Sequence, residues 1–203
     1  MPLAVLTRHG LSEHNLDTRF YMGRSPGSRL TDAGRAQAEI LGQRLARDWP
    51  VSRIVASSLP RCLETASIVA ARAGIREVHP DEAFWELSKG DWEGRMPRAG
   101  VPAALQQELD ADPFHFRFPG GESFADVQAR VVPAFRRWEL RGEAESVLYV
   151  LHGDVLAALF QHLLGFPPAR VRDYLVAPCS VTRFGRVAGS YRLLGYNENP
   201  AAG

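Results

Sequence analysis

Residues 3–15 read LAVLTRHGLSEHN, an apolar run followed directly by a cluster of arginine, histidine and glycine. A short apolar run that ends at a turn signal is typical of a buried strand. In an open α/β sheet, ligands bind beyond the carboxyl ends of such strands. We therefore predict a central strand at Leu3 to Leu6, with Arg8 and His9 facing a ligand and Gly10 letting the backbone approach it.

The same arrangement recurs twice further along the chain. In VASSLPRCLETA, residues 55–66, an apolar run is followed by Arg61 in the first turn of a predicted helix, where an anion is favoured. In VLYVLHGDVLAAL, residues 147–159, the run is followed by His152. Adjacent parallel strands lie about 4.8 Å apart, so the side chains at their ends can reach one tetrahedral oxyanion. We therefore predict one pocket of the size of a phosphate. Its members are Arg8, His9, Arg61 and His152.

Arginine and histidine together suit phosphoryl chemistry. A guanidinium donates paired hydrogen bonds to phosphate oxygens and stays charged at any ordinary pH. Nearby arginines also lower the pKa of a histidine, which favours the neutral imidazole that a nucleophile must be. His9 is therefore the candidate nucleophile. Glu86, in FWELSKGDWEG (residues 84–94), is the candidate acid for the leaving oxygen, with a pKa raised by Trp85 and Trp92 beside it.

Strand-like and helical patterns alternate along the chain. Strands are predicted at Leu3 to Leu6, Ser52 to Ala56, Val147 to Leu151 and Val181 to Phe184. Helices are predicted within residues 30–49 behind a Thr31 cap, at Leu59 to Ala73 and at Ser123 to Arg141. This order predicts an α/β fold with a mostly parallel central sheet covered on both faces. The segment Phe84 to Gly121 breaks the pattern, and we expect it to form a cap over the sheet.

Length and composition limit the class of protein. At 203 residues, with no dividing linker, the chain predicts one domain over residues 1–203. The net charge of +1 argues against a general nucleic-acid or membrane surface. Two cysteines are too few for a disulfide framework. Met1-Pro2 leads directly into a strand, and no apolar run approaches the roughly 20 residues of a membrane span, so a cytoplasmic protein is expected.

The chain resembles the histidine phosphatase superfamily, which includes the cofactor-dependent phosphoglycerate mutases, in six successive stretches: RHGLSEHN, LTDAGRAQA, SSLPRCLETA, ELSKGDWEG, PGGES and LHGDVLAAL. The resemblance spans Leu3 to about Gly195 and implies a three-layer α/β/α sandwich, phosphoglycerate mutase-like. It implies that His9 becomes the phosphohistidine and that Glu86 donates a proton and later activates water. It also implies that the phosphoryl oxygens are bound by Arg8, Asn15, Arg61 and His152.

Within that family the chain resembles the phosphatases more than the mutases. ELSKGDWEG differs from the mutases' Glu-Arg-His-Tyr-Gly stretch, and the segment after it is shorter and lacks their paired arginines. Leu11, Ser12 and Leu151 differ from the residues common in the family but leave the charged members of the pocket intact. The resemblance thus implies a phosphatase that acts on small phosphorylated metabolites, with no cofactor and no metal.

Other interpretations stay open. A mutase would move the phosphoryl group between hydroxyls of one sugar acid, and a phospholigand-binding module would not turn over. A metal site on His9 and His152 is disfavoured, because nearby arginines repel a cation and Glu86 would be the only obvious third ligand. The expected partner is a small phosphate ester, with no nucleic acid and no membrane. A homodimer is compatible with the sequence, which does not decide the oligomeric state.

Several nearby residues have simpler interpretations. Surface or satisfied core positions are predicted for His14, His79, His115 and His162. Asp154 is interpreted as an N-terminal helix carboxylate, and Glu93 as a turn or surface residue. For three aromatic residues, a place in the wall of the substrate pocket is slightly favoured over a place in the core: Trp92, Phe114 and Phe116.

Overall fold

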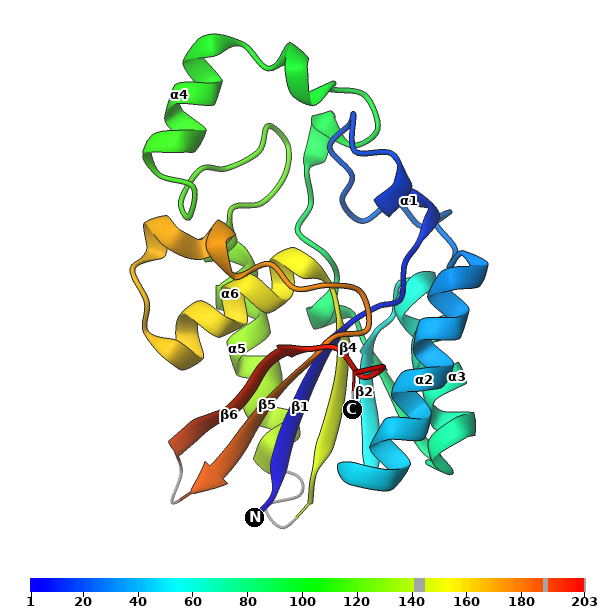
Figure 1. Cartoon of the computed structure of the whole chain (residues 1–203). Helices are drawn as coiled ribbons and strands as arrows, with labels where there is room; N and C mark the ends of the chain where they lie inside the picture. The colour runs from blue at the N-terminus through cyan, green and yellow to red at the C-terminus, as the bar shows by residue number, and fades with distance from the viewer. Residues whose placement is uncertain (141–144, 188–189, 203) are drawn as a thin grey trace.

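The computed structural model describes residues 1–140, 145–187 and 190–202, and within these ranges six strands form one sheet, in the order β3-β2-β4-β1-β5-β6 (Figure 1). The strands are β1 Leu3–Arg8, β2 Arg53–Ser57, β3 Glu77–Asp81, β4 Val147–Leu151, β5 Val181–Val187 and β6 Ser190–Glu198. The first four strands pair in parallel, whereas β5 runs antiparallel to β1 and β6 antiparallel to β5. The prediction of a mostly parallel sheet is confirmed.

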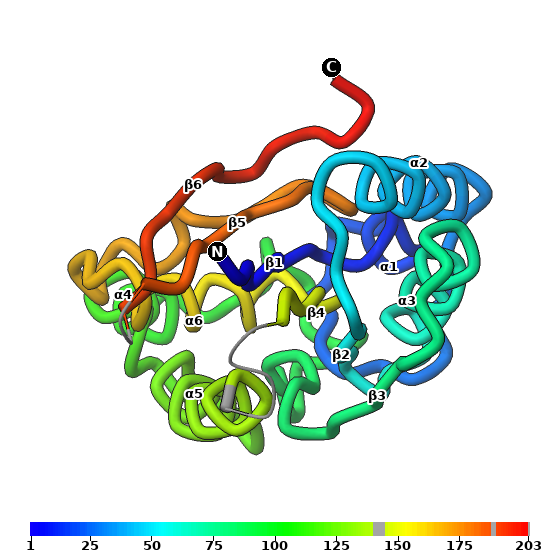
Figure 2. The backbone as a smooth tube through the Cα atoms, turned by 90° about the horizontal axis from the view of Figure 1, so that it is seen from below, coloured from blue at the N-terminus to red at the C-terminus, as the bar shows by residue number. Residues whose placement is uncertain are grey.

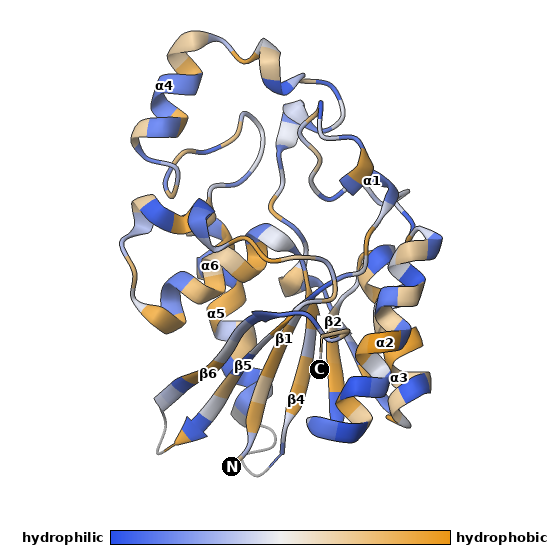
Figure 3. Ribbon diagram, viewed as in Figure 1, coloured by the Kyte–Doolittle hydropathy of each residue, from blue (hydrophilic) through white to orange (hydrophobic). Residues whose placement is uncertain are grey.

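Helices cover both faces of this sheet, as the view from below shows (Figure 2). One face carries α2 (Asp32–Asp48) and α3 (Pro60–Ala73), and the other carries α5 (Phe124–Leu140) and α6 (Gly153–Leu164). The central strands β1, β2 and β4 are mostly apolar (Figure 3), and β4 is buried along its whole length. Burial on two faces explains why the central strands read as continuous apolar runs rather than alternating ones.

The helices begin and end at recognisable signals. Thr31 caps α2 because its Oγ1 accepts a hydrogen bond from the Gly34 N–H at 3.0 Å. α3 starts at Pro60 and stops at Gly74, whose φ of 70° is left-handed. The predicted end of α5 at Arg141 lies outside the described residues. In the described part of the chain, no helix combines the length and the apolar character that a bilayer crossing requires.

The sequence analysis missed two strands, and both lie at the edges of the sheet. β3 reads EVHPD and pairs with β2, and its Pro80 is tolerated because an edge strand needs hydrogen bonds on one side only. β6 pairs with β5 through irregular register. Edge strands are exposed, so they lack the apolar run by which the central strands are found.

The segment 84–121, called the cap below, lies over the carboxyl end of the sheet (Figure 1). It contains α4 (Ala103–Ala111) and two short 3-10 helices, η2 (Gly90–Trp92) and η3 (Arg98–Gly100). All of its phenylalanines and tryptophans except Trp85 share one hydrophobic cluster with α5 and α6. The preference for Trp92, Phe114 and Phe116 as walls of the substrate pocket is therefore wrong, since these residues form the core beneath the cap.

Candidate active site

The carboxyl ends of β1 and β4 place two histidines side by side. Arg8 and Leu151, the last residues of β1 and β4, pair in the parallel register. His9 and His152 directly follow them. Their ring centroids lie 5.3 Å apart. Both side chains are buried, with 2% of His9 and 0% of His152 exposed. The sheet therefore brings together two of the predicted site residues.

Hydrogen bonds determine which nitrogen of His9 is free to react. Nδ1 lies 2.8 Å from the carbonyl oxygen of Gly10, and a carbonyl only accepts, so Nδ1 carries the proton. Nε2 is then the basic nitrogen, and it accepts a hydrogen bond from Arg61 Nε at 3.3 Å. Burial lowers the pKa of His9 well below its ordinary value, and the charges of Arg61 and Arg8 lower it further. At neutral pH the ring is a neutral nucleophile.

Arg61 is held in place from the opposite side by a loop. It stands in the first turn of α3 and is 3% exposed. Its Nη2 donates to the carbonyl oxygen of Gly23 at 3.0 Å, and its Nη1 donates to that of Arg24 at 3.4 Å. Backbone carbonyls orient a guanidinium without neutralising it. The charge of Arg61 therefore remains available to an anion near His9.

A cavity of about 550 Å³ reaches this cluster beneath the cap. Among the predicted site residues, its wall includes Arg8, His9, Asn15, Arg61 and Glu86. His152 is not part of the wall. Its Nε2 lies 2.8 Å from the Ser57 Oγ, so the ring supports His9 from behind, and its contact with a phosphoryl oxygen stays a prediction.

Arg8 and Asn15 offer hydrogen-bond donors to the cavity. Arg8 Nη1 donates to the Val176 carbonyl oxygen at 3.1 Å, but its buried Nε has no hydrogen-bond partner among the described residues. The Oδ1 of Asn15 accepts hydrogen bonds from the backbone N–H and the hydroxyl of Ser12, both at 3.0 Å. This fixes the amide of Asn15. A buried N–H without a partner is costly, and an oxyanion in the cavity would satisfy it.

Glu86 is the proton-carrying group of the cavity. Burial raises its pKa to about 7, and the negative charge of Asp154 contributes to the rise. Burial alone would also raise the pKa of Asp154, but the Lys89 ammonium 2.7 Å away lowers it. One carboxyl group thus holds a proton near neutral pH while its neighbour is ionised. Burial beside tryptophans was the predicted cause of the raised pKa, and the part of Asp154 was not predicted.

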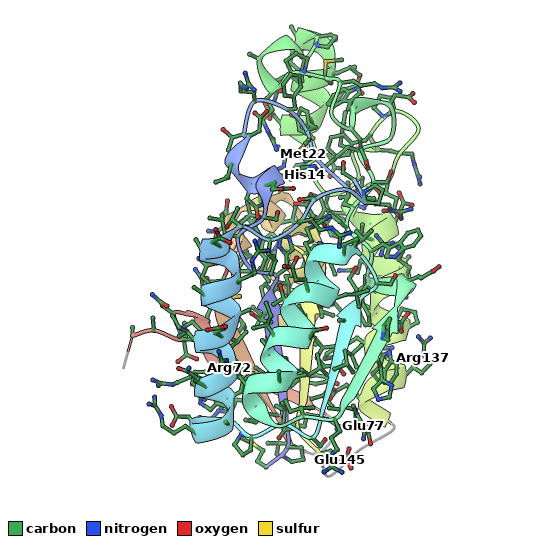
Figure 4. All side chains as sticks on the ribbon, turned by 90° about the vertical axis from the view of Figure 1, so that its right-hand side faces the viewer. His14, Met22, Arg72, Glu77, Arg137 and Glu145 are labelled. Carbon is green, nitrogen blue, oxygen red and sulfur yellow. The ribbon has the colours of Figure 1, made fainter. Side chains whose placement is uncertain are left out.

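No role in the site was predicted for three residues that lie in it or beside it. His14 lines the cavity half-buried, where a surface or satisfied core histidine was predicted, and Figure 4 shows it beside Met22 beneath the cap. Lys89 is buried against Asp154. Glu93 stands in the turn after η2, as predicted, and accepts hydrogen bonds from the backbone N–H groups of Arg24 and Lys89. The sequence signal for His14 and Lys89 is only that they stand close to predicted site residues, one position from Asn15 and three positions from Glu86.

Gly10 has a different role from the predicted one. A Cβ on Gly10 would lie 2.5 Å from the carbonyl oxygen of Gly34, and a Cβ on Gly34 would collide with that of Leu11. The two glycines therefore let the first turn of α2 press against the loop that follows His9. The expectation that Gly10 lies against a ligand is corrected to a contact with α2.

The site thus combines a neutral nucleophile, cationic donors and a protonated carboxyl group. Among the described residues, no group of three or more histidine, cysteine, aspartate or glutamate side chains is arranged to hold a metal ion. Nucleophilic attack, stabilisation of an anion and proton donation are all available from side chains of the chain itself.

Known proteins resemble this chain over most of its length. It is 36% identical over 172 residues to glucosyl-3-phosphoglycerate phosphatase of Mycolicibacterium vanbaalenii, covering 80% of this chain and 74% of that protein. It is 33% identical over 178 residues to a 2,3-bisphosphoglycerate-dependent phosphoglycerate mutase of Methylobacterium radiotolerans, covering 84% and 83%. The structure of Bacillus stearothermophilus YhfR superposes with a TM-score of 0.88 at 30% identity, covering 98% of each chain.

The structural match shows a phosphoglycerate mutase-like fold, and the sequence relatives include both a phosphatase and a mutase. The model of the histidine phosphatase superfamily, branch 1, matches residues 4–199, which is nearly the whole chain. The pair of histidines lies within that range, as does the whole sheet except its first residue, Leu3. The chain therefore belongs to branch 1 of the histidine phosphatase superfamily.

Proposed function

We propose that the protein is a metal-independent phosphomonoesterase that acts on small phosphorylated metabolites through a phosphohistidine at His9. The observation that carries this proposal is a buried, neutral His9 whose Nε2 faces Arg61 in a cavity that also holds Glu86 with a pKa of about 7. Displacement at phosphorus requires a nucleophile, a cation that stabilises the negative charge of the phosphoryl oxygens, and a proton donor, and this cavity contains all three.

In the first step the lone pair of His9 Nε2 attacks phosphorus, and the bond from phosphorus to the ester oxygen breaks. Arg8 and Arg61 neutralise charge on the non-bridging oxygens. Glu86 gives its proton to the departing oxygen, which leaves as an alcohol. The products of this step are the phosphohistidine and the carboxylate of Glu86.

In the second step a water molecule attacks the phosphorus of the phosphohistidine. The Glu86 carboxylate takes a proton from the water as the new bond forms and the bond from nitrogen to phosphorus breaks. Inorganic phosphate leaves, and His9 and Glu86 return to their starting states. A pKa near 7 suits a group that must act first as an acid and then as a base.

The relatives support this proposal and also supply its rival. Glucosyl-3-phosphoglycerate phosphatase is a phosphatase by name, whereas the Methylobacterium radiotolerans relative is a mutase. We favour hydrolysis because the stretch ELSKGDWEG and the shorter segment after it lack the mutase features, including the paired arginines. A mutase would hand the phosphoryl group of the phosphohistidine to a second hydroxyl instead of to water.

The test is a single-turnover reaction of the protein with a ³²P-labelled phosphomonoester in EDTA. Acid-labile, alkali-stable label on the protein, followed by released phosphate, is the expected result. His9→Ala is expected to lose the label, and His79→Ala is the matched control because His79 lies on the edge strand β3. Full activity of His9→Ala would refute the mechanism. Transfer of label from 2,3-bisphosphoglycerate to phosphoglycerate, without release of phosphate, would favour the mutase.

A further inference from the structure

The cavity carries more positive charge than one phosphoryl group requires. Five cationic side chains line it: Arg8, Arg61, Lys89, Arg98 and Arg172. The wall has three carboxyl groups, on Asp17, Glu86 and Asp154. Asp154 pairs with Lys89 at 2.7 Å, and Asp17 pairs at 2.9 Å with Arg19, which does not line the cavity. The four arginines therefore have no carboxylate partner within the described ranges. Positive charge gathered in a recess attracts anions.

These arginines fall into two pairs. Arg8 and Arg61 flank the nucleophile, and the charge of each lowers the pKa of His9. Arg172 lies on the Asp154 side of the cavity, because its charge, together with those of Lys89 and Arg8, lowers the pKa of Asp154. The first pair accounts for a phosphoryl group attached at His9. Arg98 and Arg172 are left for a different part of the same ligand.

Arg98 and Arg172 stand on different walls of the cavity. Arg98 belongs to η3 of the cap, and its guanidinium lies 4.3 Å from the centroid of the Tyr21 ring. Stacking on an aromatic ring orients a guanidinium before a ligand arrives. Arg172 belongs to η4 (Pro168–Tyr174), the segment that follows α6. Figure 1 shows this segment, in orange, beside α6 and the cap above the sheet.

The volume and lining between these arginines suit an organic molecule. About 550 Å³ falls within the range of roughly 300–1,000 Å³ that is usual for pockets that hold small organic ligands. Apolar side chains, among them Phe20, Met22 and Leu175, share the wall with the charged ones. A carbon skeleton can therefore lie between the phosphoryl group and a second charged group.

We propose that Arg98 and Arg172 form a second anion site, which selects phosphate esters that carry a further anionic group, a carboxylate or another phosphate. This proposal rests on the proposed function, since it assigns the remote end of the substrate of that reaction. The guanidinium fork matches the geometry of both anionic groups. Arg98 and Arg172 are then specificity-determining residues, whereas His9 and Glu86 carry the chemistry.

The test compares substrates that differ only at the remote end. 3-Phosphoglycerate and glycerol 3-phosphate share a three-carbon skeleton, and a carboxylate in the first replaces a hydroxymethyl group in the second. We expect the wild type to prefer 3-phosphoglycerate, and Arg98→Gln and Arg172→Gln each to lower kcat/KM for it about 10-fold, mainly through KM. Glycerol 3-phosphate should be affected less than about 2-fold. Propane-1,3-diol bisphosphate and propyl phosphate form the second pair, which shows whether the preferred anion is a carboxylate or a phosphate.

Two matched variants control for a loss of surface charge. Arg170→Gln changes an exposed arginine of the same 3-10 helix that pairs with Asp173 and lies off the cavity. Arg95→Gln changes an exposed arginine of the cap that does not line the cavity. Both are expected to keep the wild-type ratio of kcat/KM between the paired substrates.

Equal loss on both members of a pair, or an unchanged ratio in Arg98→Gln and Arg172→Gln, would overturn the second anion site while leaving the phosphatase intact. If the wild type hydrolysed neither substrate, the proposed function would fail instead. Calorimetric titration with the same two compounds would still decide the inference. Tighter binding of 3-phosphoglycerate that the two variants abolish supports the site, and equal binding of both compounds refutes it.

Discussion

Glu86 owes its chemistry to its neighbours. Its pKa of about 7 comes from burial and from the charge of Asp154, and both effects disfavour the ionised carboxylate. Near pH 7 it therefore exists in both protonation states. A double displacement needs the acid in one step and the base in the next, so both Glu86 and the neighbour that sets its pKa, Asp154, should affect the rate.

Glu86→Gln should slow hydrolysis according to the leaving group. For an alkyl phosphate, whose oxygen must be protonated, we expect turnover to fall by about 10²- to 10⁴-fold. For 4-nitrophenyl phosphate, whose leaving oxygen is stable as an anion, the formation of the phosphohistidine should fall much less. Steady-state and single-turnover rates on both substrates measure this. The exposed Glu82→Gln is the control, and equal losses on both substrates would show that Glu86 is not the leaving-group acid.

Asp154→Asn should move the alkaline limb of the pH profile to lower pH. Glu86 must be protonated to act as an acid, so kcat/KM for an alkyl phosphate falls as pH rises through about 7. Removing the negative charge of Asp154, and with it the partner of Lys89, stabilises the Glu86 carboxylate and lowers its pKa. The measurement is kcat/KM from pH 5 to 9, with Asp110→Asn in the cap as control. A limb that stays in place would contradict this electrostatic coupling.

The sequence revealed the charged centre of the site but not its surroundings. His9, Arg61 and Glu86 were predicted because each follows a strand or stands in a stretch that resembles the family. His14 and Lys89 lie beside predicted residues, but nothing local says which way their side chains point. Arg98 and Arg172 come from irregular segments that only the folded chain brings to the cavity. Their role depends on tertiary structure, which short-range patterns do not contain.

At the scale of elements, α2 is joined to the active-site loop by a contact between glycines. Gly34 lies in the first turn of α2, and its Cα faces the backbone of residues 10–11. Gly34→Ala should force the helix and the loop apart, destabilise the fold by about 1–3 kcal/mol and lower kcat, because His9 stands at the start of that loop. Urea unfolding and single-turnover rates measure the two effects.

Gly27→Ala is the matched control for this contact. Apart from its two chain neighbours, no residue that the structure describes has a heavy atom within 4 Å of the position that its Cβ would take. Stability and phosphorylation rate should therefore stay close to wild type. A stable, fully active Gly34→Ala protein would mean that α2 and the loop can separate without consequence.

The strands and helices that were predicted from the sequence are mostly those with a buried apolar run or with clear start and stop residues. β1, β2 and β4 lie at the centre of the sheet, and α2 and α3 carry a cap, a starting proline or a terminal glycine. β3 and β6 escaped prediction because their place is set by pairing with a neighbouring strand, and their exposed residues follow no apolar pattern. The contact between β5 and β6 could be inferred only from the folded chain.

At the scale of the whole molecule, the cap and the sheet share one core. Phe84 and Phe118, at the two ends of the cap, lie in the same hydrophobic cluster as Phe135 of α5 and Tyr149 of β4. Two carboxylates also stabilise the start of the cap, because Glu122 and Glu93 accept hydrogen bonds from the backbone N–H groups of Ser88 and Lys89. The prediction of a single domain stays a prediction, and unfolding tests it.

The cap should unfold together with the sheet in one transition. In a Trp49→Phe/Trp138→Phe protein the remaining tryptophans, Trp85 and Trp92, both report on the cap, whereas far-ultraviolet circular dichroism reports mainly on the large helices. The two urea curves should coincide. Phe118→Ala should shift both by about 3–5 kcal/mol, whereas Leu16→Ala, 65% exposed, should shift them by less than about 0.5 kcal/mol. An earlier fluorescence transition would make the cap a separate unit.

The unpaired arginines of the cavity also bear on how fast a substrate arrives. The chain as a whole has a net charge of only +1, so little attraction is felt far from the molecule. Close to the mouth, within a Debye length of about 8 Å at physiological ionic strength, the guanidinium groups steer small anions inward. Added salt would then slow encounter with a substrate that carries two anionic groups more than with one that carries the phosphate group alone, while the bond-breaking steps at His9 continue at the same rate.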